Sequence, residues 1–255
     1  MKLIQELWES LTESLVGLGS VTRFLLRLLA ASPRALLRPD LISQQIYNAG
    51  ALSLVIIMLS GLFVGMVLGL QGFQLLQRFG SEEALGTAAA IGLVKELGPV
   101  VTALLFAGRA GTALASELGL MRATDQISAM EMMAVDPIQR VVVPRFLGGV
   151  IAMPLLAAIF SVIGIYGAQL VGVQIMGVDS GSFWSQMRAA VDLKAINEGI
   201  VKSCIFGVTC SLIAVYQGYY AQPTAEGVGR ATTRTVVTSA VFILFLDYLL
   251  TAAFL

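Results

Sequence analysis

The sequence contains no histidine and only two cysteines among its 255 residues. The absence of histidine excludes most catalytic metal sites and the Ser-His and Cys-His pairs of many hydrolases. Cys204 and Cys210 lie in one apolar stretch, roughly 9 Å apart along a helix, which is too far for a disulfide. We therefore expect no disulfide framework, and we interpret both thiols as small core residues.

Charged residues are also scarce, at 13% of the chain, which is about half the usual share. Sixteen Lys and Arg balance sixteen Asp and Glu, so there is no basic field of the kind that binds nucleic acid. The sequence lacks a P-loop, a His-Glu-x-x-His zinc motif and a nucleophile elbow. We therefore expect a chain that is not an enzyme, that binds no metal or cofactor, and that holds no ATP through a P-loop.

Apolar residues, by contrast, are in excess, at 57%. A soluble domain of this length cannot bury so much apolar surface, whereas a helix that crosses a membrane needs about 20 such residues. Segment 84–94 either extends the second of the apolar runs or forms a separate, shorter piece in the membrane. We predict an all-α integral membrane protein with five transmembrane helices, in the runs Ala49 to Leu70, Leu97 to Gly119, Phe146 to Met176, Ile200 to Tyr220 and Thr235 to Leu255.

The first 45 residues follow another pattern, in which leucines recur at helical spacing while Glu6, Glu9 and Glu13 occupy other faces. This pattern predicts an amphipathic helix on the membrane surface, and a soluble docking helix is the alternative. The early glutamates argue against a secretory signal peptide. We therefore divide the chain into a surface helix with its linker, residues 1–45, and a transmembrane domain, residues 46–255.

Lysines and arginines are distributed unevenly over the predicted loops. With a cytoplasmic N-terminus, ten of the sixteen lie in cytoplasmic segments, three in outer loops and three in or beside spans. Because loops rich in Lys and Arg stay in the cytoplasm, we predict an N-terminus inside and a C-terminus outside. The ten are Lys2, Arg23, Arg27, Arg34, Arg38, Arg122, Arg140, Arg145, Arg230 and Arg234.

Glycines repeat every four residues along the first span, at Gly61, Gly65 and Gly69, and Gly72 lies near the same face. Small residues let helix backbones approach closely in lipid. Our hypothesis is that two copies of the chain meet at this seam. The alternative is contact with another span of the same chain, which offers a similar strip. Bulkier side chains on or near the seam would then line a cavity for an acyl chain, and they are Leu68, Leu75, Leu76 and Phe79.

The segment between the second and third spans predicts a short helix on the cytoplasmic side. Asp125 is a candidate N-cap, and Asp136 followed by Pro137 is expected to end the helix. An exposed face rich in methionine suits a groove in another protein, and folding back against the chain's own spans is the alternative. The residues that share this face are Ile127, Met130, Met133 and Ala134.

Charge within or beside a span is costly and marks function, and besides Arg109 and Glu117 in the second span there are four such residues. Lys95 and Glu96 precede a Leu-Gly-Pro sequence, while Lys202 and Asp247 lie at similar depth in the last two spans. A structural pair between Lys202 and Asp247 is one interpretation, because a long lysine can reach. A polar site for a lipid headgroup or a gate, with Glu96 as its main member, is the other.

Several long, ungapped motifs lie along the chain. Glu96 to Gly119 reads ELGPVVTALLFAGRAGTALASELG, and Met121 to Gln126 and Met130 to Pro137 read MRATDQ and MEMMAVDP. Two further motifs are GRATTRTVV, from Gly229 to Val237, and SGLFVGMVLGLQG, from Ser60 to Gly72. Together these motifs closely resemble the MlaE (YrbE) permease family, and the likeness covers most of the chain from about residue 41.

The resemblance implies the membrane subunit of an ABC transporter that moves phospholipids between the inner and outer membranes of Gram-negative bacteria and maintains outer-membrane lipid asymmetry. In that family two permease copies in the inner membrane pair with ATPase subunits, which bind ATP and Mg, and with a STAS-domain protein. A hexamer of MCE-domain subunits covers the periplasmic side. The helix from Asp125 to Ala134, including Glu131, would be the coupling helix, and the lipid cavity would lie between the copies near Lys95 and Glu96.

Three other functions remain open at this point. A secondary transporter would use the intramembrane charges as a proton relay, although no paired repeat with interrupted helices is present. An intramembrane enzyme would need a nucleophile and a base, and we find no such pair. A scaffold that anchors an ATPase without transporting lipid would share every feature of the sequence.

Overall fold

The computed structural model describes residues 19–33 and 38–254, and within these ranges every regular element is helical. Residues 19–33 form a first helix, α2 is Pro39–Ala49, α3 is Leu54–Gln77, and α4, α5 and α6 are Leu85–Ile91, Gly98–Phe106 and Thr112–Ala123. The short α7, Gln126–Met132, is followed by α8, Val143–Gln169, α9, Ser180–Ala190, α10, Leu193–Tyr219, and α11, Ala225–Phe254.

Several of these helices run on through short irregular turns and form five candidate membrane spans, which confirms the predicted fold class. The spans are Pro39–Gln77, Glu82–Ala123, Ile138–Ile175, Leu193–Tyr219 and Ala225–Phe254. Segment 84–94 is part of the second span, which therefore extends rather than dips. At 42 residues this span measures about 63 Å, roughly twice a hydrocarbon core, so it projects beyond the membrane.

The second span contains two π-helical turns, Gly92–Leu97 and Ala107–Gly111, and a third, Ile138–Val142, opens the next span. Two of the three lie just before a proline, Pro99 or Pro144, which cannot donate the backbone hydrogen bond of a regular helix. A π turn inserts one extra residue and re-aims the side chains that follow it. The first π turn carries both Lys95 and Glu96, so it sets where these two side chains point.

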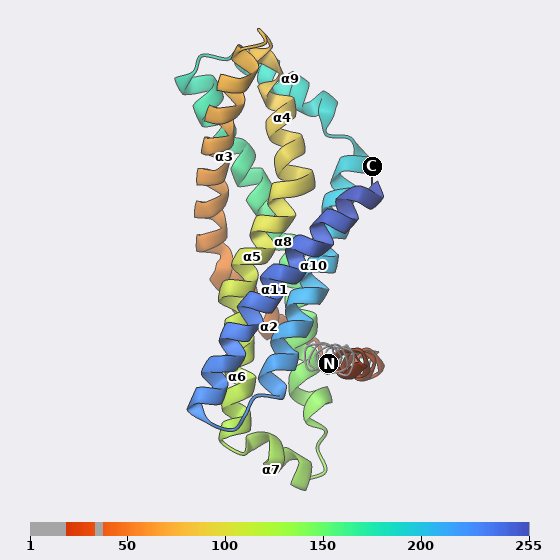
Figure 1. The fold of residues 1–255 in the computed structure, drawn as a ribbon. Helices are drawn as coiled ribbons and strands as arrows, with labels where there is room; N and C mark the ends of the chain where they lie inside the picture. The colour runs from red at the N-terminus through yellow and green to blue at the C-terminus, as the bar shows by residue number, and fades with distance from the viewer. Residues whose placement is uncertain (1–18, 34–37, 255) are drawn as a thin grey trace, which may run out of the picture.

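The connections lie at two opposite ends of the bundle (Figure 1). One end carries α7 and the turn between α10 and α11, and the other carries α9 and the turn between α3 and α4. Between them, Phe106, Phe160 and Phe206 meet in a core formed by α5, α8 and α10. Cys210 is buried in this core as predicted, but Cys204 is exposed because it lies on the outer face of α10.

The helix formed by residues 19–33 lies across the bundle rather than along it (Figure 1). Its Phe24 is 1% exposed and contacts Tyr216, Tyr219 and Tyr220 near the end of α10, with ring centroids 5.6 to 5.8 Å apart. Leu26 and Leu29 on its other side are exposed. The expected surface helix begins in residues 1–18, which lie outside the described residues, and the expected boundary at residue 45 falls inside α2.

The glycine seam of the first span is occupied by α8 of the same chain, so the prediction of a dimer seam there is wrong. A Cβ atom built on Gly65 would lie 1.9 Å from the carbonyl oxygen of Gly164. Similar atoms on Gly61 and Gly69 would lie 2.9 and 2.8 Å from carbonyl oxygens of α8, and one on Gly72 would meet Leu85. The strip predicts that two helix backbones approach closely, but it does not specify which helix is the partner.

Candidate functional site

An apolar groove of about 570 Å³ opens along the outer face of α3. Leu68 and Leu75 line it, as expected for an acyl-chain cavity, but Leu76 packs against a small cluster around Leu85 and Phe183. Phe79 is 76% exposed in the turn after α3 and lies outside the groove. The full lining is Phe63, Val64, Val67, Leu68, Gln71, Gly72, Leu75, Ala88 and Leu97.

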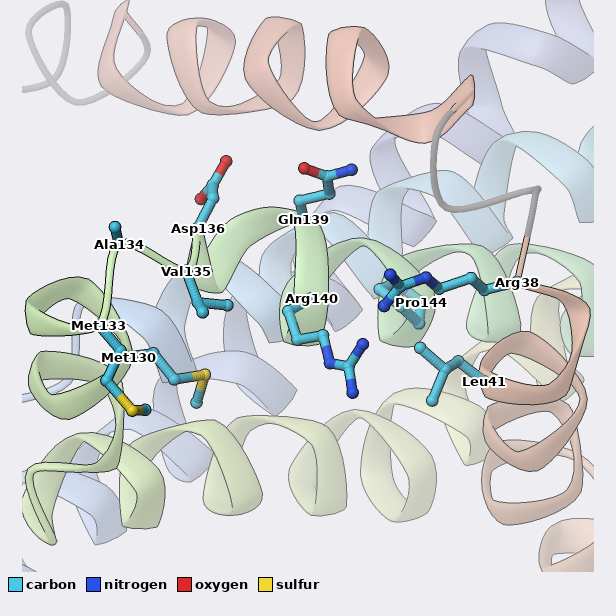
Figure 2. Close-up of a pocket in the computed structure, with 10 residues that line it drawn as sticks. All are labelled: Arg38, Leu41, Met130, Met133, Ala134, Val135, Asp136, Gln139, Arg140 and Pro144. Atoms are coloured by element: carbon cyan, nitrogen blue, oxygen red, sulfur yellow. The ribbon is translucent and has the colours of Figure 1, made fainter.

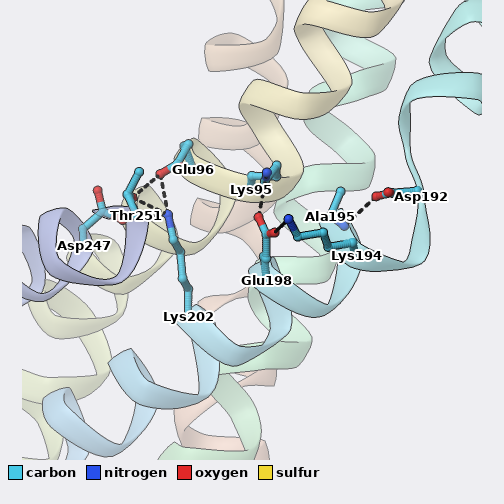
Figure 3. Close-up of polar contacts among 9 residues, drawn as sticks. All are labelled: Lys95, Glu96, Asp192, Lys194, Ala195, Glu198, Lys202, Asp247 and Thr251. Atoms are coloured by element: carbon cyan, nitrogen blue, oxygen red, sulfur yellow. Dashed lines mark hydrogen bonds and ion pairs between the residues drawn. The ribbon is translucent and has the colours of Figure 1, made fainter. Parts of the chain in front are cut away.

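A cluster of charges joins the first π turn, which also carries Leu97 of the groove, to α10 and α11 (Figure 3). The ammonium of Lys202 on α10 donates to Glu96 Oε2 at 2.5 Å and to Thr251 Oγ1 at 2.7 Å. It also lies 3.4 Å from Asp247 Oδ1 on α11. Lys202 is buried, while Glu96 and Asp247 remain partly open, at 39% and 24% exposure of their side chains. The structure thus brings Lys202 and Asp247 together as predicted, and adds Glu96 to the pair.

Lys95 points away from Glu96 and belongs to a second cluster (Figure 3). Its ammonium lies 2.6 Å from Glu198 Oε2, and Lys194 lies 3.8 Å from the other oxygen of the same carboxylate. Lys95 is therefore neutralised by a neighbour on α10 and does not line the apolar groove. Sequence reasoning missed Glu198 because it precedes the charge-free run. Its position one helical turn before Lys202 was the available signal.

Arg109 is a further functional candidate that the sequence left without a partner. It lies on the second π turn and donates to the backbone oxygen of Asn48 at 2.6 Å and to Ser53 Oγ at 3.1 Å. Both acceptors lie at the break between α2 and α3, where carbonyl groups lack helical partners. This intramembrane arginine therefore holds the bend of the first span against the second.

The helix α7 is shorter than the predicted 125–134 and exposes only part of the predicted face. Asp125 stands at its N-cap with φ 57°, but its side chain makes no capping hydrogen bond. The helix ends before Asp136, because Ala134 adopts φ 59° and the amide of Val135 donates back to Met130 O at 2.9 Å. That pattern is a Schellman turn, which requires a left-handed residue.

The face of α7 on which Ile127 lies turns inward, so its predicted exposure is wrong in part. Ile127 is 1% exposed, and Met130 packs against the cluster formed by the ends of the spans. Met133 and Ala134, on the predicted face, are exposed as expected, Met133 by 67%, and Met132, 83% exposed, and Glu131 add to this surface. The difference arises because the ends of the chain's own spans bury Ile127 and part of Met130, on the side of α7 that was predicted to face a partner.

Comparisons with known proteins identify similar permease proteins. The family model described as permease MlaE matches residues 42–253. The chain is 49% identical over 253 residues to the intermembrane phospholipid transport system permease protein MlaE of Haemophilus influenzae, across 99% of this chain and 97% of that protein. It is 38% identical over 212 residues to a probable ABC transporter permease protein of Rickettsia typhi, across 83% and 82% of the two chains.

A plant protein shares the same sequence pattern. The chain is 31% identical over 211 residues to the chloroplastic protein TRIGALACTOSYLDIACYLGLYCEROL 1 of Arabidopsis thaliana, across 83% of this chain and 60% of that protein. The five spans, the intramembrane charges and the long matches all point the same way, and the chain belongs to the MlaE permease family.

Proposed function

We propose that this chain is the permease subunit of an ABC transporter that moves phospholipids between the inner and outer membranes of Gram-negative bacteria and so maintains outer-membrane lipid asymmetry. The similarity to the intermembrane phospholipid transport system permease protein MlaE of Haemophilus influenzae supports the class of transporter. A separate ATPase subunit supplies the energy and binds ATP with Mg.

The observation that carries the proposal is an apolar groove beside a charged cluster inside the membrane. Leu97 lines the groove, and the residue before it, Glu96, belongs to the cluster with Lys202 and Asp247. A phospholipid has the same division between apolar chains and a polar headgroup. We place acyl chains along Leu68 and Leu75, and the headgroup near the partly open carboxylates.

The groove is open on one side, along the lipid-facing surface of α3. We propose that a second copy of the chain closes it, so that the working permease is a homodimer with its lipid between the copies. The glycines at Gly61, Gly65 and Gly69 do not take part, because α8 covers them. The dimer contact therefore uses the bulky outer residues of α3, among them Phe63 and Val67, which are 60% and 52% exposed.

The coupling surface for the ATPase is the outer face of α7, formed by Glu131, Met132 and Met133. Methionine side chains adapt to a groove, which suits a joint that moves. ATP shifts the equilibrium only if it binds one state of the assembly more tightly than the other. Closure of the ATPase would then move α7 and the second and third spans, and would change the width of the groove.

The remaining partners and the orientation follow from the family resemblance and the charge distribution. We place the chain in the inner membrane with a cytoplasmic N-terminus and a periplasmic C-terminus. A STAS-domain subunit then accompanies the ATPase inside, and a hexamer of MCE-domain subunits receives or delivers lipid on the periplasmic side.

The decisive experiment reconstitutes the purified complex of permease and ATPase in vesicles and measures exchange of a labelled phospholipid with acceptor vesicles. Exchange that requires ATP is the expected result. Exchange driven by a proton gradient without ATP would instead show a secondary transporter. Normal ATP hydrolysis with no exchange under any condition would reduce the chain to a scaffold.

Variants of α7 test the coupling surface in the same assay. Met132→Ser with Met133→Ser should remove co-purification of the ATPase and ATP-driven exchange, while the chain folds normally because both side chains are exposed. Met187→Ser on α9, at the opposite end of the bundle, is the matched control and should retain both activities. Full coupling in the double variant would show that the ATPase binds elsewhere.

A further inference from the structure

A second cavity, of about 560 Å³, lies at the α7 end of the molecule, away from the lipid groove (Figure 2). It is formed where α2, the end of α7 and the beginning of the third span meet. We call it the arginine cavity, because two arginines that are about 100 residues apart in the sequence line it. Its lining is Arg38, Leu41, Met130, Met133, Ala134, Val135, Asp136, Gln139, Arg140 and Pro144.

Both arginines lie at the beginning of a membrane span. Arg38 directly precedes Pro39, the first residue of the first span, and Arg140 is two residues after Ile138, the first residue of the third. Figure 2 shows both guanidinium groups turned into the same space. These two spans have 39 and 38 residues and are longer than a hydrocarbon core, so their first residues lie on the aqueous side of the core, where phospholipid headgroups also lie.

Neither guanidinium has a hydrogen bond or an ion pair with any residue that the structure describes. Of the other arginines at this end, Arg145 lies 3.2 Å from Glu117 and Arg230 pairs with Glu226, whereas Arg122 and Arg234 also have no partner among the described residues. Among the described residues of the lining Asp136 is the only carboxylate; it accepts from the amide of Ile138 at 2.9 Å, and Figure 2 shows it turned away from both arginines. Two cations that converge without a counter-charge repel each other, and an anion between them removes this repulsion.

Part of the apolar lining lies deeper than the two cations, while Met130, Met133, Ala134 and Val135 line the cavity from the α7 end. Leu41 and Pro144 are three and four residues further into their spans than Arg38 and Arg140. A ligand that fits has a charged group at the boundary and apolar chains toward the membrane centre, which is the order of groups in a phospholipid. Guanidinium groups bind phosphate oxygens with two parallel hydrogen bonds, and basic pockets at span ends bind anionic lipid headgroups.

We propose that the arginine cavity binds the headgroup phosphate of an anionic glycerophospholipid from the leaflet nearest α7. This lipid is not the transported one, because the cavity and the groove on α3 share no lining residue. Met130 and Val135, at the end of α7, form part of the cavity wall. The bound lipid therefore joins α7 to the first and third spans and stiffens the coupling surface.

The test measures lipid binding to the purified full chain in a neutral detergent by native mass spectrometry. The probes are phosphatidylglycerol and phosphatidylcholine with identical acyl chains. We expect one phosphatidylglycerol per chain, bound at least about tenfold more tightly than phosphatidylcholine. Arg38→Gln and Arg140→Gln should each weaken phosphatidylglycerol binding about tenfold, and the double variant about a hundredfold, as for two charge-assisted contacts.

Two matched variants separate a specific site from a loss of general charge. Arg234→Gln removes a cation at the same end of the molecule but outside the cavity, and it should leave binding unchanged. Arg38→Lys with Arg140→Lys should weaken binding less than the glutamine pair, because lysine keeps the charge but loses the paired hydrogen bonds. All variants should unfold at the wild-type temperature, since both arginines are exposed.

Several results would overturn the proposal. Phosphatidylglycerol binding that is undiminished in the Arg38→Gln and Arg140→Gln double variant would show that the lipid binds elsewhere. Displacement of the lipid by millimolar inorganic phosphate would show a site for free phosphate. If the Arg38→Gln and Arg140→Gln double variant lost co-purification of the ATPase but still bound phosphatidylglycerol, the occupant of the cavity would be an acidic side chain of the ATPase. None of these outcomes depends on whether the groove on α3 transports lipid.

Discussion

Lys202 is the residue on which the charged cluster depends. Its side chain is 1% exposed, and it is the one cation within ion-pair distance of Glu96 and Asp247 among the described residues. It therefore links the second, fourth and fifth spans at one point. A buried ion pair contributes little net stability when intact, but losing one partner leaves the other charge without compensation.

We expect Lys202→Met to lower the free energy of unfolding by roughly 2 kcal/mol, below the range of about 3–5 kcal/mol for a fully buried pair because the carboxylates are partly exposed. Thermal unfolding of the purified chain in detergent measures the change. Adding Glu96→Gln and Asp247→Asn should restore most of the loss, since no unpaired charge remains. Lys194→Met, at a side chain that is 73% exposed, is the control and should change little. Equal losses in Lys202→Met and the triple variant would contradict this account.

At the scale of elements, the contact between α3 and α8 is a pairing of backbones. Gly65 and Gly164 face each other so closely that no side chain fits between the helices. In lipid, where no hydrophobic force drives apolar helices together, such close packing supplies much of the association energy. It also leaves the opposite face of α3 free for the groove.

Gly65→Ala should therefore destabilise the chain by at least about 1–3 kcal/mol, the usual cost of overpacking, because the new methyl group meets backbone that cannot move aside. Gly108→Ala is the matched control, since nothing lies within 4 Å of a Cβ atom at that position. It should leave stability unchanged or raise it by up to about 1 kcal/mol. Thermal unfolding compares the two variants, and a similar loss in both would mean that the helices are not held by this contact.

In the whole molecule, the two ends of the bundle differ in the number of arginines that they carry. The end with α7 carries Arg122, Arg140 and Arg230, while the end with α9 carries Arg78 and Arg188. The segments that connect successive spans therefore lie alternately at the two ends, as five membrane spans require.

Labelling with an impermeant thiol reagent tests the orientation in a background that lacks Cys204 and Cys210. Ser185→Cys on α9 should react in intact spheroplasts, because the end with fewer cations faces the periplasm. Glu131→Cys on α7 should react only after lysis. Both positions are exposed, so access to the residue itself does not limit either reaction. The opposite pattern would invert the topology and remove the proposed site for the ATPase.

The spans, the class of protein and most of the charged residues of the candidate site could be predicted from the amino-acid sequence alone. Runs without charge predict membrane helices because the hydrocarbon core excludes charge, and long motifs identify the family whatever the packing. Lys202 and Asp247 were paired correctly, since depth along a span follows from the rise of a helix. Which neighbour covers each face could be learned only from how the helices pack. In the structure α8 covers the glycines of α3, Glu198 forms an ion pair with Lys95, and the chain's own spans bury Ile127. Helical periodicity specifies which residues share a face, but the partner of that face depends on how all the spans pack together.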